Sequence, residues 1–193
     1  MNKHRYKSFE IEVFDDSDHR FGAADNKFNY SKYYFGESSK SFPVSRHGIK
    51  IYKSGKEFND GIVIGFAGKT IVHKNSSLVE NDSLILCCCD TVFCLTVPEL
   101  ELRWKLPLDP TICMQIFKLN KDLLIHGESQ ISCINKNGVI KWRFSAEDVF
   151  VSNTHEQEII IDSDSILITD INKTKYKLSH KGELLSTSNK GIE

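Results

Sequence analysis

The sequence contains no apolar run long enough to cross a membrane or to serve as a signal peptide. Its first residues, 1–13, mix charged and apolar side chains instead of forming such a run. We therefore expect a cytoplasmic protein with no membrane partner. In that reducing compartment the six cysteines are expected to remain free thiols.

An excess of charge of either sign is also missing. The 25 Lys and Arg residues oppose 26 Asp and Glu residues, which gives a formal net charge of −1. No global field draws in nucleic acid or an acidic membrane, so neither is an expected partner. The segment Lys27 to Tyr34 interleaves basic and aromatic residues, as single-strand binding surfaces do, and nucleic-acid binding ranks third among the functions considered.

Motifs for metal binding and hydrolysis are absent as well. Cys87, Cys88 and Cys89 are adjacent, but no CxxC spacing occurs, and neighbouring residues of a strand point to opposite faces. The acidic residues at 15–18 lack the Gly and the distal Glu of a calcium loop. No Gly-x-Ser-x-Gly segment marks a nucleophile elbow. We expect no metal, no cofactor and no catalytic residue.

What the sequence does contain is an internal repeat. Aligning Cys94 with Cys133 offsets the two copies by 39 residues, and aligning Trp104 with Trp142 offsets them by 38. A third copy is expected to begin near residue 159 and to carry Leu178 where the others carry Trp. A period of this length is typical of solenoids and propellers.

Each of the first two copies ends in an alternating segment. At 100–106 and at 140–144, apolar residues share one face and charged residues the other. This pattern predicts an outer strand with one packed face and one wet face. The preceding runs at 92–95 and 131–134 are apolar or small throughout, which predicts inner strands covered on both faces. Three further strands are predicted ahead of these runs, at 71–73, 112–119 and 149–151.

Four strands in roughly 40 residues is the size of one β-propeller blade. The sequence therefore predicts an all-β fold of tandem four-stranded antiparallel meanders of blade type, in a small or incomplete propeller. A β-sandwich or barrel with similarly spaced strands is the alternative. Three clear copies are too few for a closed ring, so a homodimer could complete the propeller.

The predicted organisation has two parts. Residues 1–41 form an N-terminal segment that covers a sheet edge, or alternatively an aromatic arm that binds a partner. Residues 42–193 hold the propeller-like repeats. These are a partial blade at 42–70 and blades at 71–110, 111–148 and 149–187.

The segment Leu123 to Phe144, with Gly138 and Trp142, resembles the repeats of quinoprotein-like (PQQ-type repeat) β-propeller proteins. The whole chain also looks like a group of small uncharacterised bacterial propeller-like proteins, some of which we expect to be immunity or accessory proteins beside toxins. In some quinoprotein dehydrogenases a pair of adjacent cysteines contacts the cofactor. The resemblance would assign that role to Cys87 and Cys88, or to Cys88 and Cys89. The chain is too short for their large ring and shows no calcium-ligand set, so no cofactor is expected.

Polar residues at predicted loops are the binding candidates: Arg46 and His47, His126 and Glu128, and Asp148. The first hypothesis is a non-enzymatic cytosolic protein-interaction module with a protein partner. The alternative is a small-molecule or carbohydrate binder, or a cryptic hydrolase. It requires His47, His126 and Glu128 to converge on one polar pocket.

Overall fold

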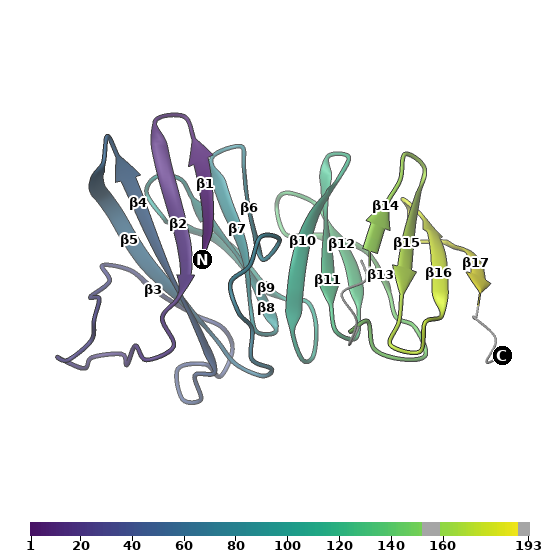
Figure 1. Cartoon of the computed structure of the whole chain (residues 1–193), viewed down its shortest axis with the longest axis horizontal. Helices are drawn as coiled ribbons and strands as arrows, with labels where there is room; N and C mark the ends of the chain where they lie inside the picture. Colours follow the sequence, from purple (N-terminus) through teal and green to yellow (C-terminus); the bar gives the residue numbers. More distant parts are fainter. Residues whose placement is uncertain (152–158, 189–193) are drawn as a thin grey trace.

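The structure, a computed structural model, describes residues 1–151 and 159–188. Over these residues it contains strands, turns and loops and no helix, so none is available to span a membrane. Four sheets follow one another in a row along the chain (Figure 1). Residues 152–158, inside the blade predicted at 149–187, lie outside the described part, as do residues 189–193.

Sheet A has five strands in the order β1-β2-β4-β5-β3, and β3 pairs in parallel with β5. The strands are β1 (Asn2–Tyr6), β2 (Phe9–Asp15), β3 (Tyr33–Phe35), β4 (Ser45–Lys53) and β5 (Lys56–Gly65). Strands from residues 1–41 therefore lie in the same sheet as β4 and β5. The division of the chain at residue 41 stays a prediction.

Sheets B, C and D are four-stranded antiparallel meanders of blade type. Sheet B holds β6 (Ser77–Glu80), β7 (Ser83–Cys88), β8 (Thr91–Thr96) and β9 (Leu102–Pro107). Sheet C holds β10 (Cys113–Leu119), β11 (Asp122–Gly127), β12 (Ile131–Ile134) and β13 (Ile140–Phe144). Sheet D holds β14 (Ile159–Ile161), β15 (Ser165–Thr169), β16 (Lys175–Ser179) and β17 (Leu184–Ser188). The predicted fold class is confirmed, and the meanders do not close into a barrel.

Alternate residues of the inner strands belong to different cores. On β7, Leu84 and Leu86 pack against sheet A, whereas Ile85 packs against sheet C. On β11, Leu123 faces sheet B and Leu124 faces sheet D. A strand between two sheets must be apolar on both faces, which explains the uninterrupted apolar runs. The predicted outer strands, β9 and β13, lie at sheet edges and alternate in exposure as expected.

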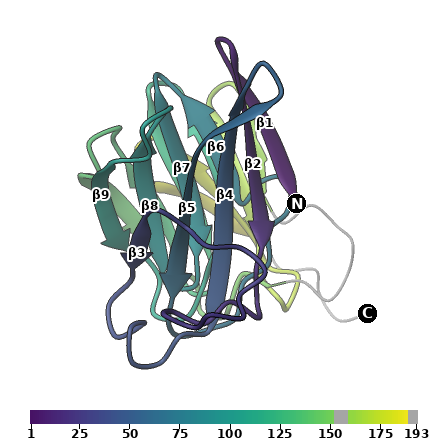
Figure 2. The ribbon, with the colours of Figure 1, turned by 90° about the vertical axis from the view of Figure 1, so that its left-hand side faces the viewer.

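The two ends of the row are finished differently. On the outer face of sheet A, Tyr30 packs with Ile62 and Ile64, and its neighbours Phe28 and Tyr33 join the same cluster. Figure 2 shows the segment that leads to β3 crossing in front of β4 and β5. The outer face of sheet D lies at the opposite end of the row, so the described sheets form an open stack (Figure 1).

Two of the three strands predicted ahead of the runs are wrong. Residues 71–73 and 149–151 are not in strands, and the first strands of sheets B and D are β6 and β14. The third, at 112–119, corresponds to β10. At 71–73 the chain instead links sheets, and the N–H of Val72 donates to the carboxylate of Asp15.

The expected equivalence of Leu178 with the repeated Trp is also wrong. The last two strands of each sheet pair Cys94 with Trp104, Cys133 with Trp142, and Lys177 with Ser186. Ser186 on β17 therefore occupies the Trp position of sheet D. The third copy was displaced by one strand because the short apolar run of β14 resembles the longer runs of β7 and β11.

Candidate functional site

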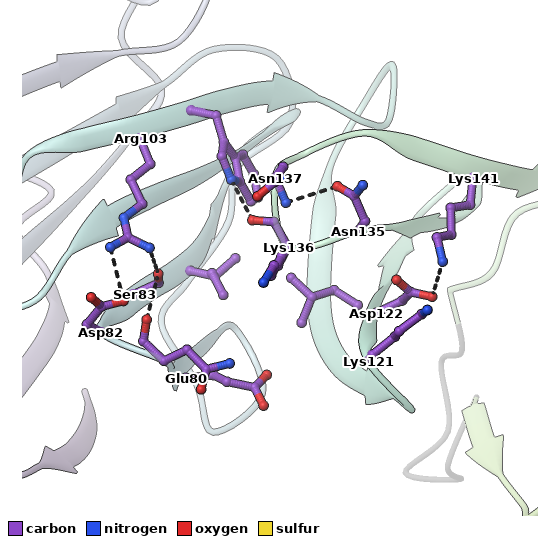
Figure 3. Close-up of a pocket in the computed structure, with 14 residues that line it drawn as sticks. Glu80, Asp82, Ser83, Arg103, Lys121, Asp122, Asn135, Lys136, Asn137 and Lys141 are labelled. Carbon is purple, nitrogen blue, oxygen red and sulfur yellow. Dashed lines mark hydrogen bonds and ion pairs between the residues drawn. The ribbon is translucent and has the colours of Figure 1, made fainter.

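A groove of about 1030 Å³ lies between sheets B and C, where the hairpin turns of the two sheets come together (Figure 3). It is larger than a groove of about 410 Å³ near Asp16 and one of about 230 Å³ near Asp109. We call it the B–C groove. Its lining residues are Glu80, Asn81, Asp82, Ser83, Ile85, Arg103, Trp104, Lys121, Asp122, Leu123, Asn135, Lys136, Asn137 and Lys141.

The sheet B wall is built around the turn between β6 and β7. Asn81 and Asp82 both have positive φ, of 47° and 58°, as a tight two-residue hairpin requires. Arg103 on β9 fixes this turn, because its guanidinium donates to Asp82 at 3.0 Å and to the Ser83 hydroxyl at 2.8 Å. The turn is therefore held against the outer strand of its own sheet.

The sheet C wall comes from two turns. The Lys141 ammonium donates to the Asp122 carboxylate at 2.5 Å, which ties β13 to the start of β11. In the turn between β12 and β13, the side-chain oxygen of Asn135 accepts the N–H groups of Asn137 and Val139 at 2.9 and 3.0 Å. These contacts fix the backbone that carries the exposed residues of this wall.

Trp104 joins the two walls. Its indole Nε1 donates to the carbonyl oxygen of Lys136 at 3.0 Å. The ring lies on Gly138, where an added Cβ would come within 2.9 Å of ring atom Cδ2. The same arrangement recurs one sheet later, where Trp142 donates to the His180 carbonyl at 3.1 Å and covers Gly182. Each Trp therefore docks on the turn of the following sheet.

Two of the predicted binding residues lie on sheet A. The Arg46 guanidinium donates to the Ser17 carbonyl at 3.3 Å. His47 is buried, with Nδ1 2.9 Å from the Asp15 carboxylate and Nε2 3.1 Å from the Thr70 hydroxyl oxygen. Burial alone would raise the pKa of Asp15, but the hydrogen bonds from His47 and from the Val72 N–H outweigh it and hold that pKa below its ordinary value. His47 and Asp15 therefore connect sheet A to the segment at 70–72, through the Thr70 hydroxyl and the Val72 N–H.

His126 lies on sheet C and is fully buried. Its Nδ1 is 3.0 Å from the Gln115 side-chain oxygen, and its Nε2 is 3.0 Å from the Phe150 carbonyl oxygen. Burial lowers the pKa of His126 to about 4. The Glu128 carbonyl oxygen accepts the N–H of Phe150 at 2.7 Å, so His126 and Glu128 both contact Phe150, which lies on the connection from sheet C to sheet D.

Asp148 is exposed and lies on the connection from sheet C to sheet D, two residues before Phe150. Its carboxylate accepts the N–H of Val149 at 2.8 Å and the side-chain amide of Asn172 at 2.7 Å. Sheet B separates His47 from His126 in the row (Figure 1). None of the three grooves described above is lined by any of the five predicted binding residues.

Asp109 is a buried charged residue that the sequence reasoning missed. Its carboxylate accepts the N–H groups of Thr111, Ile112, Ser129 and Gln130, and also the Thr111 hydroxyl. It therefore ties the segment before β10 to the turn between β11 and β12. The Asp-Pro-Thr sequence was an available signal, since Asp commonly accepts the N–H two residues on in such turns.

All six cysteines are free and buried. Within residues 1–151 and 159–188, no group of three or more His, Cys, Asp or Glu side chains is placed to hold a metal ion. The polar groups of the B–C groove are ammonium, guanidinium, carboxylate and amide groups around Ile85, Leu123 and Trp104. Such a set can bind a ligand by charge, hydrogen bonding and apolar contact.

No protein-family model and no curated protein matches this sequence. Three similar solved structures are BamB from Moraxella catarrhalis, the Pan2 WD40 domain of Neurospora crassa and the computationally designed Ika8 protein. BamB is 11% identical with a TM-score of 0.47, over 77% of this chain and 46% of BamB. The Pan2 domain is 16% identical with a TM-score of 0.49, over 65% of this chain and 39% of that one. Ika8 is 7% identical with a TM-score of 0.55, over 97% of this chain and 60% of Ika8.

This chain therefore spans less than two thirds of each of these three structures. The similarity to Ika8 is one of fold alone, and it extends over nearly the whole chain. Sheets B, C and D have the strand arrangement of propeller blades. A closer relation to quinoprotein-like repeats stays a prediction.

Proposed function

We propose that this protein is a non-enzymatic protein-interaction module in which the B–C groove receives a segment of a partner protein. The observation that supports this is the size and construction of the groove. Its volume of about 1030 Å³ is at the upper end of that of small-molecule pockets and is sufficient for several residues of a peptide. Its turns are held by Arg103, Asn135 and Trp104, so the groove is formed before a partner arrives.

A small-molecule or carbohydrate binder, or a cryptic hydrolase, has less support. That alternative needs His47, His126 and Glu128 around one cavity. His47 and His126 lie on sheets A and C, each is buried, and each has both ring nitrogens close to polar atoms of its own surroundings. Their positions are those of histidines that hold loops to sheets.

Completion of a ring by a second copy also has less support. Closure would bring another sheet onto the outer face of sheet A, where Phe28, Tyr30 and Tyr33 already pack. Gly48 makes room for this cover, because a Cβ there would come within 2.3 Å of the Tyr30 hydroxyl. We therefore propose a partner protein in the B–C groove in preference to a homodimer.

The test is site-specific photo-crosslinking. A benzophenone amino acid replaces the exposed Asn137 in the groove, and a control chain carries it at the exposed Lys56 on sheet A. We expect a polypeptide that crosslinks through position 137 and not through position 56. The same polypeptide, once purified, must bind the wild-type chain and be displaced from position 137 by excess unlabelled protein. Equal crosslinking from both positions, or none from position 137, would contradict the proposal.

The identity of that polypeptide also tests the finer role. The resemblance to small bacterial propeller-like proteins supports an immunity or accessory protein, which requires the crosslinked partner to be a toxin. A partner of another kind would support the interaction module and contradict the immunity role. The cytosolic location stays a prediction from the sequence.

A further inference from the structure

The acidic residues of the B–C groove are all neutralised within the protein. Glu80 lies 2.9 Å from the Lys118 ammonium, and Asp82 lies 3.0 Å from the Arg103 guanidinium. The third, Asp122, contacts the Lys141 ammonium at 2.5 Å. A cationic ligand would have to compete with these pairs for each carboxylate.

The remaining charges of the groove are two lysines. Lys121 lies in the turn between β10 and β11, and Lys136 lies in the turn between β12 and β13, and both are exposed. Within the part of the chain that the structure describes, neither ammonium group has a hydrogen bond or an ion pair. The charge that the groove offers to a ligand is therefore positive.

The corresponding place between sheets C and D is occupied from within the chain. His180 matches Lys136, because each supplies the carbonyl that accepts the indole N–H of the preceding sheet's Trp. The His180 ring lies 3.2 Å from the Asn120 side chain and 3.1 Å from the Asp162 carbonyl oxygen, so it bridges the turns of the two sheets. At the B–C groove no such bridge forms, and Lys136 remains available.

We propose that the B–C groove binds an acidic, extended peptide segment, which rests on the proposed function of this site. Carboxylates of the segment pair with Lys121 and Lys136, and an apolar side chain between them packs against Trp104 and its neighbours Ile85 and Leu123. Both lysines belong to the sheet C wall, where Figure 3 shows them on two separate turns. A nucleic-acid strand fits less well, since a continuous line of phosphates would pass Glu80, Asp82 and Asp122.

The experiment pans a random twelve-residue peptide library on the immobilised full-length protein. A charge-reversed chain, Lys121→Glu with Lys136→Glu, is the comparison. The matched control is Lys40→Glu with Lys56→Glu, which changes the net charge equally at two exposed lysines remote from the groove. Because all four substitutions are on the surface, each chain is expected to unfold at the same denaturant concentration, and this is measured first.

We expect the enriched peptides to carry at least two Asp or Glu residues around an apolar residue. A synthetic peptide of the enriched sequence is expected to bind the groove variant at least about tenfold more weakly than the wild type, and the control variant within about twofold. Its affinity should also fall as the salt concentration rises.

Three results would overturn the inference in different ways. If the enriched peptides are neutral or basic and crosslink through position 137, the proposal of an acidic ligand is contradicted, whereas the proposal of a protein-interaction module stands. Absence of any peptide that depends on the groove contradicts both proposals. A single-stranded oligonucleotide that binds the wild type, and fails to bind only the groove variant, would replace the peptide with nucleic acid.

Discussion

Replacement of Gly182 by alanine tests the docking of each Trp on the following sheet. Gly182 has φ +83°, and a Cβ there would come within 2.5 Å of ring atom Cδ2 of Trp142. A left-handed backbone costs a non-glycine residue about 1–2 kcal/mol. The added methyl also displaces the ring and breaks the hydrogen bond from Trp142 to the His180 carbonyl, which is worth about 1 kcal/mol. We expect Gly182→Ala to lower the free energy of unfolding by about 3 kcal/mol.

Gly55 supplies the matched control. It has φ +76°, but no atom lies within 4 Å of the position of its Cβ. Gly55→Ala should therefore cost only the backbone strain, about 1–2 kcal/mol. Urea unfolding followed by the fluorescence of the two Trp residues measures both variants. Equal losses for Gly55→Ala and Gly182→Ala would refute the docking argument.

A double-mutant cycle isolates the contact itself. With Trp142→Ala already present, Gly182→Ala no longer meets an indole ring, and its additional cost should fall to that of Gly55→Ala. If the two substitutions are additive, the ring and the glycine are not coupled. A coupling of about 1–2 kcal/mol, the difference between the two expected costs of Gly182→Ala, is the result that the geometry predicts.

Three further predictions concern buried groups. The folded-state pKa of His126 is about 4, below its ordinary value of about 6.5, so its contribution to stability is complete above pH 6.5 and is lost as pH falls toward 4. Between pH 7 and pH 5 the wild type should lose roughly 2 kcal/mol more than His126→Gln in urea titrations, and parallel pH profiles would contradict this. Asp109→Asn should cost about 2–3 kcal/mol, because one amide oxygen cannot replace a carboxylate that accepts five hydrogen bonds. Asp122→Asn, at a partly exposed ion pair with Lys141, should cost less, under about 1 kcal/mol. A thiol reagent should react rapidly with no cysteine of the native protein and with all six in denaturant, because all six are buried. Cys89 is the sharpest test, since hydrogen bonding lowers its pKa to about 6 and only burial protects it. Rapid reaction of Cys89 in the native protein would show that sheets A and B separate readily.

The inner strands were predictable because burial on both faces leaves a strong pattern. Residues 92–95 and 131–134 are apolar or small at successive positions, and the structure covers both of their faces. The outer strands were predictable for the opposite reason, since their one packed face imposes alternation. Both inferences need only the local sequence.

The third copy was misaligned because it lacks the residue that marks the position. Trp104 and Trp142 pack on glycines of the following turns, and the described residues contain no such turn after Ser186. A Trp at that position would be exposed without a docking surface. The alignment then relied on short apolar runs, which occur in more than one strand of the same sheet, as in β14 and β15.

The B–C groove could not be predicted from the sequence. Its residues come from three hairpin turns, two outer strands and two inner strands, and each turn taken alone is an ordinary polar turn. Only the three-dimensional structure shows that Glu80, Asp82 and Asp122 are paired while Lys121 and Lys136 are not. The sequence indicated His47 and His126 as polar residues near predicted loops, yet both are buried in strands and contact polar groups of their own surroundings.

The two end faces of the stack explain why sheets A and D differ in sequence from sheets B and C. The β12 sequence, Ile-Ser-Cys-Ile, has no charged residue because both of its faces are covered, whereas the matching strand β16 alternates Lys175 and Lys177 with the buried Tyr176 and Leu178. At the other end, an apolar face of sheet A is covered by the aromatic segment before β3. A stack of repeats needs terminal faces that are either polar or covered, and this chain uses one of each. The exposed large apolar side chains of sheet D, Ile160, Leu184 and Leu185, lie on its first and last strands, whereas its central strands β15 and β16 carry none.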